Sequence, residues 1–293
     1  MKEALTAAPA VARRTRRRAR HTRAGNVVAY VLMVLLLALV LAPLYWLVIS
    51  SAKPAAEVIR QPPTFFPAAW SGQHFSDLFA ASDYPIYLRN SVEVAIGTVV
   101  LTLVLAAPAA YAVYRIPFRG RGLVLRGFLL AYAFPSIVLL VPLYRMMSAV
   151  HLINTLASLV IVNVTFAAPF SVWMLQAFFR TVPVELEEAA AIDGAGWASI
   201  LIRVLLPLIA PGLITIAIFA FISSWTEFTF ASALILDDAR KTLPVGLAQI
   251  IGQYQIDWGL LAAGAVVTVA PVLIFFGLIG RRFVAGLTAG AIK

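Results

Sequence analysis

The sequence predicts an all-α membrane protein with six transmembrane helices. Hydrophobic residues make up 62% of its 293 positions, charged residues make up only 12%, and the mean hydropathy is +0.92. A soluble domain of this length would carry far more charge on its surface. Several apolar runs reach the roughly 20 residues that an α-helix needs to cross the hydrocarbon core of a bilayer. The chain is therefore predicted to cross the membrane several times.

The first 25 residues form a polar, basic extension, in which seven arginines precede the first apolar run. Next to a membrane span, such a cluster favours anchoring of the cytoplasmic end against anionic lipid. An RNA-binding arm is the alternative for a chain of net charge +10. We favour membrane lipid as the partner and expect no nucleic acid. The apolar run 26–51 is too long for the cleaved region of a signal peptide, which favours a retained span.

A six-helix transmembrane domain is expected over residues 26–282, followed by a tail at 283–293 that is rich in small residues. The loop 52–87 contains several prolines and aromatic residues, and it is too irregular to cross lipid. The predicted spans are 26–51, 90–114, 122–141, 155–179, 204–230 and 258–280.

Lysine and arginine residues are divided unevenly between the two sides of this arrangement. If both termini are placed in the cytoplasm, most of the 23 Lys and Arg residues lie on the cytoplasmic side. The bias persists when the N-terminal cluster is left out. Because positive charge favours the cytoplasmic side of a membrane, we expect both termini and the loop 181–207 to be cytoplasmic.

The loop 181–207 is a polar interruption between two long apolar runs. Three glutamates follow Pro183, where a helix N-terminus favours negative charge, and the Asp-Gly pair at Asp193 and Gly194 is typical of a helix end. A second helix is expected to restart near Trp197. The pattern predicts a short helix, a glycine turn and a second helix at one membrane face. The glutamates are Glu185, Glu187 and Glu188.

This loop resembles the EAA loop of permease subunits of binding-protein-dependent ABC importers. A Glu-Ala-Ala triplet, a glycine and a Leu-Pro pair occur at the separations of that motif, with valine where the family prefers isoleucine. The alternative is an amphipathic surface helix that has no partner. The matching residues are Glu188, Ala189, Ala190, Asp193, Gly194, Val204, Leu206 and Pro207.

Other segments resemble the membrane subunits of maltose-type carbohydrate transporters, and in particular the smaller of the two. Thr226 stands where that family usually has asparagine. The resemblance implies a cytoplasmic-membrane protein that pairs with a second permease subunit, two cytoplasmic ATPase subunits and an extracytoplasmic substrate-binding protein to import a sugar. The matching segments are 63–67, 89–91, 109–112, 225–228, 243–247 and 286–291.

The resemblance also implies roles for individual residues. Glu188 to Gly194 would form a coupling helix seated in a groove of the ATPase, with Glu188 contacting a basic residue there. The tail would reach the ATPase dimer, although a frayed chain end is the alternative. The tail residues concerned are Gly286, Leu287, Thr288, Ala289 and Gly290.

Trp225, Glu227 and Phe228 are candidates for the outer end of the translocation pathway. Aromatic faces stack on sugar rings, and carboxylates bind hydroxyl groups. The alternative is that these residues belong to the aromatic belt at the membrane surface.

The sequence contains no pattern for catalysis, for a metal or for a cofactor. No Gly-rich phosphate loop precedes a Lys-Ser or Lys-Thr pair, so we expect ATP hydrolysis to reside in partner subunits. An ion-coupled secondary carrier is the alternative function, and a membrane enzyme is a third. At about 1.5 Å per residue, Glu227 lies roughly 36 Å beyond Arg203 and Glu93 roughly 33 Å before Arg115, which leaves the membrane midplane without ionisable residues. That distribution disfavours the secondary carrier.

Overall fold

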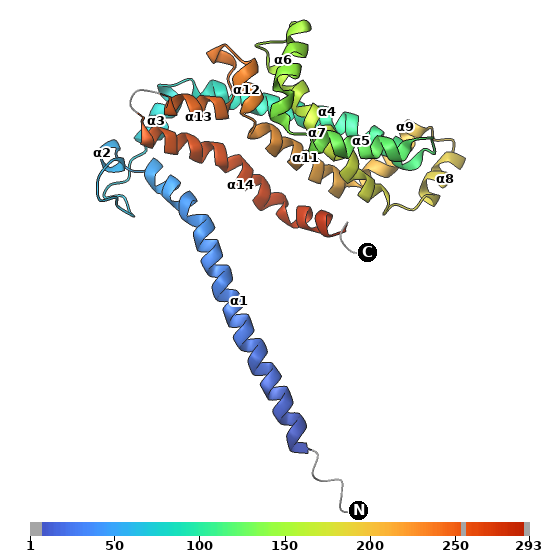
Figure 1. Ribbon diagram of the computed structural model, residues 1–293, viewed down its shortest axis with the longest axis horizontal. Coiled ribbons are helices and arrows are strands. Elements are labelled where there is room, and N and C mark those ends of the chain that lie inside the picture. Colours follow the sequence, from blue (N-terminus) through green and yellow to red (C-terminus); the bar gives the residue numbers. More distant parts are fainter. Residues whose placement is uncertain (1–7, 253–255, 290–293) are drawn as a thin grey trace, which may run out of the picture.

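The computed structural model describes residues 8–252 and 256–289, and this part of the chain is helical, without strands (Figure 1). Four of its helices are long and apolar enough to cross a membrane, and two bent helix pairs raise the number of spans to six if each pair counts as one. The four spans lie within α1 (Ala8–Ser51), α4 (Tyr84–Arg115), α7 (Leu156–Phe179) and α14 (Trp258–Ala289), and α11 (Ala210–Trp225) belongs to one of the bent pairs. The shorter elements are α2 (Ala55–Val58), α3 (Gln73–Ala80), α5 (Arg121–Ala133), η1 (Ser136–Leu139), α6 (Leu140–Ala149), α8 (Glu185–Ile192), α9 (Trp197–Ser199), η2 (Ile200–Leu205), α10 (Leu206–Leu208), α12 (Thr229–Leu234), η3 (Asp238–Arg240) and α13 (Leu243–Ile251).

The centre of the bundle is formed by α4, α7 and α11, with α5 and α14 alongside them (Figure 1). Helix α1 projects away from this bundle, and its side chains from residue 26 to residue 43 are exposed. Helix α8 lies at one end of the bundle, and α2, α3 and α13 lie at the other. The α8 end and the α13 end are named accordingly below.

Small residues let the central helices approach one another closely. Ala106, Ala107 and Ala110 of α4 are buried in a core cluster together with Leu175 and Phe179 of α7. Lipid tails are as apolar as these side chains, so close packing rather than escape from water holds membrane helices together. The contacts between the central helices are therefore stabilised by the close fit of their side chains.

A buried polar contact adds to this packing at the crossing of the three central helices. The Thr98 hydroxyl lies 3.2 Å from the Ser224 hydroxyl, and the Asn163 amide nitrogen donates to the same oxygen at 3.2 Å. These residues come from α4, α11 and α7 respectively. Hydrogen bonds of this kind between membrane helices are worth about 0.6–2 kcal/mol each.

The third and fifth predicted spans, over 122–141 and 204–230, are bent. Helix α5 stops at Ala133, and the segment that follows turns by 92°. Pro135 explains this break, because it lacks an N–H group and disfavours helical geometry at the preceding residue. The fifth span bends by 84° near Ile209 and its helix ends at Trp225, before α12 begins.

Both ends of the described chain are helical. Helix α1 begins at Ala8, so the backbone of most of the basic extension continues the first span. Helix α14 continues to Ala289, so residues 283–289 of the predicted tail are helical. Gly290 lies outside the described residues.

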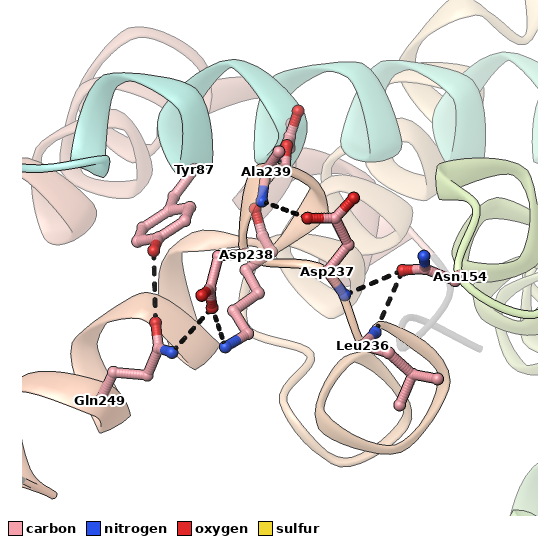
Figure 2. A network of polar contacts seen from close by, with 9 residues as sticks. Tyr87, Asn154, Leu236, Asp237, Asp238, Ala239 and Gln249 are labelled. Atoms are coloured by element: carbon pink, nitrogen blue, oxygen red, sulfur yellow. Dashed lines mark hydrogen bonds and ion pairs between the residues drawn. The ribbon is translucent and has the colours of Figure 1, made fainter.

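A polar network joins two connections at the α13 end (Figure 2). Asn154 has a φ of 61°, and its side-chain oxygen accepts hydrogen bonds from the backbone N–H groups of Leu236 at 3.1 Å and Asp237 at 3.0 Å. The Asn154 N–H in turn donates to the Leu234 carbonyl at 2.8 Å. Asn154 therefore fixes the connection between α6 and α7 to the segment that follows α12.

The second half of the network holds α13 in place. Gln249 donates to Asp238 at 3.1 Å and accepts a hydrogen bond from the Tyr87 hydroxyl at 3.3 Å. Lys241 forms an ion pair with Asp238, and the hydrogen bond between them holds the pKa of that carboxyl below its usual range. The α13 end is thus tied to α4 by side chains from three elements.

We expect the change Asn154→Ala to lower the stability of the folded protein by about 1–2 kcal/mol, because it removes two hydrogen bonds and leaves a non-glycine residue at positive φ. Asn154→Gly should be milder, since glycine tolerates that conformation. The measurement is the thermal unfolding midpoint of the purified protein in detergent. Equal midpoints for Asn154→Ala and the unchanged protein would contradict the structural role given to Asn154.

Candidate functional site

Helix α8, at one end of the bundle, contains the Glu-Ala-Ala triplet. It begins after Pro183 and carries three glutamates in its first turn, as the sequence predicts. Negative charge at a helix N-terminus interacts favourably with the partial positive charge of the unpaired N–H groups. The short helix, the turn and the restarting helix at Trp197 are therefore all confirmed.

Gly194 ends α8 in a left-handed conformation, with a φ of 83°. Its N–H donates to the Ala191 carbonyl at 3.0 Å, and the Ala195 N–H donates to the Ala190 carbonyl at 3.0 Å. This pair of bonds is the Schellman arrangement, which satisfies the last carbonyls of a helix. A Cβ atom at Gly194 would meet nothing within 4 Å, so the backbone conformation alone demands glycine here.

The two faces of α8 differ in what they contact. Ala190 and Ala195 pack against the largest core cluster, whereas Glu188 and Ala189 are exposed. Ile192 lies one helical turn after Glu188 and is 87% exposed. The outward face thus combines a carboxylate with an apolar side chain that the described part of the chain leaves exposed.

Ile192 and Trp197 were not singled out from the sequence. Trp197, at the start of the next helix, is 65% exposed. Two features of the sequence could have indicated them. Ile192 is four residues after Glu188 and so lies on the same helix face, and Trp197 is a large aromatic residue in a polar loop.

Arg115 connects α8 to the rest of the bundle. It is the last residue of α4, and its Nε atom lies 2.6 Å from the Oε1 atom of Glu187. Both side chains are only 12% exposed. Neither atom has a hydrogen-bond partner of suitable geometry, so charge holds this contact. A buried carboxylate left without its cation would be strongly unfavourable.

The Arg115 guanidinium also binds the end of α7. Its Nη2 atom donates to the carbonyl of Phe179 at 3.2 Å and to that of Val182 at 2.6 Å. A cation near the C-terminus of a helix interacts favourably with its free carbonyls. One side chain therefore joins α4, α7 and α8. The sequence predicted Glu187 at a helix N-terminus and did not indicate its pairing with Arg115.

The second helix of the loop changes geometry before it enters the fifth span. Residues Ile200–Leu205 form a π-helix, which directly precedes Leu206 and Pro207. Val204 and Leu206 are half-buried, Pro207 is exposed, and Leu205 belongs to the core. Wider helical turns of this kind are common at functional sites.

The three residues predicted for the outer pathway have contacts of their own. Trp225 is buried and its indole N–H donates to the Thr268 carbonyl at 2.9 Å. The Glu227 carboxylate accepts hydrogen bonds from Phe230 N–H at 2.7 Å and Ala231 N–H at 2.9 Å, at the start of α12. Phe228 is exposed. Their contact with a solute stays a prediction.

The tail residues predicted to reach a partner lie partly outside the described structure. Residues 286–289 belong to the last turns of α14, and nothing further is described for Gly290. Their role also stays a prediction. Within residues 8–252 and 256–289, no three His, Asp or Glu side chains come close enough together to hold a metal ion.

Two transport permeases are similar in sequence to this chain over most of its length. The trehalose transport system permease protein SugB of Mycobacterium tuberculosis is 37% identical over 265 residues, which cover 90% of this chain and 96% of that protein. The diacetylchitobiose uptake system permease protein DasC of Streptomyces coelicolor is 34% identical over 268 residues, covering 92% of this chain and 96% of that protein.

The fold also matches a solved structure, the bacterial ABC transporter involved in the import of the acidic polysaccharide alginate. The match covers 90% of this chain and 98% of the other, with a TM-score of 0.79 and 22% identity. This structure shows the fold, and the sequence relatives show that the chain is a permease subunit of an ABC importer and not an enzyme. The sequence profile of the "binding-protein-dependent transport system inner membrane component" family matches residues 99–288, a region that contains the whole of α8. The chain belongs to this family.

Proposed function

We propose that this chain is one of two membrane subunits of an ATP-driven importer that carries a sugar or a sugar derivative across the cytoplasmic membrane. The observation that carries the proposal is α8, a short helix fixed at one end of the bundle whose outward face has no cover in this chain. The sugar substrate is inferred from the trehalose and diacetylchitobiose systems to which the related permeases belong.

The working complex would contain a second permease subunit, two cytoplasmic ATPase subunits and an extracytoplasmic substrate-binding protein. Both termini of this chain and α8 would face the cytoplasm, where the ATPase subunits hydrolyse ATP. The exposed Glu188 carboxylate would bind a basic side chain of the ATPase, and Ile192 would fill an apolar recess beside it.

Coupling would follow from the rigidity of the α8 attachments. Closure of the ATPase pair displaces α8, and a displaced α8 carries Glu187 and therefore Arg115 with it. Because Arg115 also binds the carbonyl groups at the end of α7, the displacement reaches two central helices at once. The spans would then move as rigid bodies between inward-open and outward-open states.

Uptake by the reconstituted complex tests this function. Vesicles holding the two permeases and the ATPases receive ATP on the ATPase side, the binding protein and labelled trehalose or diacetylchitobiose on the other side, and ionophores that collapse every ion gradient. We expect uptake that persists and depends on ATP hydrolysis. Uptake that disappears with the gradients while ATP remains would instead identify an ion-coupled carrier.

Glu188→Arg and Gly194→Val should each reduce substrate-stimulated ATPase activity and uptake about tenfold or more. The first reverses the charge offered to the ATPase, and the second places a β-branched residue at positive φ, which costs about 1–2 kcal/mol or more. Gly196→Ala is the matched control, since Gly196 has a negative φ and open space around it. Full activity in correctly inserted Glu188→Arg and Gly194→Val complexes would show that α8 does not couple.

Glu187→Gln should loosen the attachment of α8 to the bundle without changing its outward face. It leaves Arg115 without its anion, and for a largely buried ion pair this costs about 3 kcal/mol of stability. The chain has no cysteine, so Ile192→Cys gives a single attachment site for a spin label. We expect the label in the permease pair, without ATPases, to become more mobile in the Glu187→Gln background.

Glu185→Gln is the control for this measurement, since Glu185 is an exposed glutamate of the same helical turn. Unchanged label mobility in Glu187→Gln would refute the support assigned to Arg115. Equal mobility increases in both variants would point to a general loss of negative charge at the helix N-terminus instead.

A further inference from the structure

Four aromatic side chains gather where α5, α7 and α11 meet, and they are called the aromatic cluster here. The ring centroids of Phe170 and Phe219 are 4.1 Å apart, those of Tyr132 and Phe170 are 4.9 Å apart, and those of Phe170 and Trp173 are 6.0 Å apart. Tyr132 is 43% exposed and Trp173 is 40% exposed. The cluster thus exposes the rings of Tyr132 and Trp173, which carry a hydroxyl and an indole N–H group, and both rings pack against Phe170.

The cluster lies well inside the membrane thickness. Phe170 is 14 residues from the start of α7, roughly 21 Å, and nine residues from its end, roughly 14 Å, by the helical rise of about 1.5 Å per residue. Solute sites of membrane transporters lie near this depth.

The break in the third span lies beside the cluster. Helix α5 ends at Ala133, one residue after Tyr132, and residues 131–138 are exposed. The last carbonyls of a helix have no intrahelical partner, and Pro135 brings no N–H group to satisfy them. Among the carbonyls of residues 130–133, the Ala131 carbonyl alone accepts a backbone hydrogen bond from beyond the helix, from Phe134 N–H at 3.4 Å, and in the next turn the Pro135 carbonyl accepts one from Val138 N–H at 3.1 Å. The break therefore exposes hydrogen-bond acceptors.

Unpaired backbone carbonyls do not face lipid tails, because each would cost several kcal/mol. At about 1.5 Å per residue, the 13 residues of α5 advance roughly 20 Å from the basic turn at Arg121, so the break lies within a hydrocarbon core of roughly 30 Å. Irregular backbone at this depth is found only where it is covered by protein or lines a water-filled cavity. The exposed face of α5 and η1 thus belongs to one of these two environments.

We infer that the aromatic cluster and the broken end of α5 line the translocation pathway and form a stacking surface for a neutral pyranose ring, an inference that rests on the proposed importer function. The faces of Tyr132 and Trp173 would pack against the C–H groups of the ring, and the free carbonyls of α5 would accept hydrogen bonds from its hydroxyl groups. The exposed side chains at the break are largely apolar, among them Leu130, Phe134 and Ile137, so a dry contact with the second permease is the competing environment, and the first test below separates it from a hydrated pathway. The helices α7 and α11 carry no charged residue, which fits an uncharged ring.

Water access to the break is the first test. In this cysteine-free chain, Ser136→Cys places a nearly isosteric thiol on the break, and Val100→Cys places one on an exposed apolar face of α4. The complete complex in nanodiscs is treated with a charged, membrane-impermeant methanethiosulfonate. We expect Ser136→Cys to react at least about tenfold faster than Val100→Cys, because only a hydrated thiol ionises and meets the reagent. Equal, slow reaction would place the break in a dry interface and overturn the inference.

Sugar stacking is the second test, made on uptake of trehalose by the vesicle system described above. Trp173→Ala should raise the KM about threefold to tenfold, the equivalent of an aromatic contact of about 0.5–1.5 kcal/mol, and Trp173→Phe should restore it. A purely structural role for Trp173 would lower the amount of assembled complex without moving the KM.

The two possible failures are distinguishable. If the unchanged complex imports neither trehalose nor diacetylchitobiose in an ATP-dependent way, the proposed function fails whatever the variants do. If the unchanged complex imports trehalose and Trp173→Ala imports it with the same KM, the stacking surface alone is refuted.

Discussion

The ion pair between Arg115 and Glu187 is the contact on which the function of this structure depends. It is largely buried, and it joins the end of α4 to the first turn of α8 while the same guanidinium binds the last carbonyls of α7. A short helix of eight residues has little stability of its own in water. Its position must come from attachments to the bundle, which are this ion pair and the packing of Ala190 and Ala195 against the core, both on the inward face of α8. The outward face is then free to bind a partner.

A second constraint acts inside the membrane, where backbone groups must find partners. The unbroken spans α4 and α7 satisfy this constraint within each helix except at one interior proline each, Pro108 and Pro169, while the chain is interrupted near Pro135 and Ile209. At the break near Ile209, Leu205 and Ile209 are buried in the core cluster, and the Ile209 N–H and carbonyl both have backbone partners. At the break near Pro135, residues 131–138 are all exposed. The two interruptions thus differ in environment, and the exposed one is the candidate source of hydrogen-bond acceptors for a solute.

The sequence was sufficient for whatever depends on local patterns. Apolar length predicted the straight spans, and the Asp-Gly pair predicted the end of α8 at Gly194. The bends were missed because a proline in an apolar run can be kept in a membrane helix, as Pro108 and Pro169 are, or can break it, as Pro135 does. Packing against neighbouring helices decides whether the helix continues through the proline, and the sequence does not show which helices are neighbours. The pairing of Arg115 with Glu187 was missed for the same reason, since they are far apart in the chain.

The contrast between Trp225 and Trp173 shows how burial separates two aromatic residues that look alike in the sequence. Trp225 stands in a segment typical of sugar permeases, yet its ring is buried and its N–H is bonded to α14. Trp173 has no such sequence signal, yet it is exposed beside a broken helix. A stacking surface for a solute needs an exposed ring with acceptors nearby, and a buried ring of the same type contributes to packing instead. Arg115 binds the carbonyl at the end of α7, and Trp173 lies on α7, so under the proposed coupling a displacement that begins at Glu187 would also reach the face that carries Trp173.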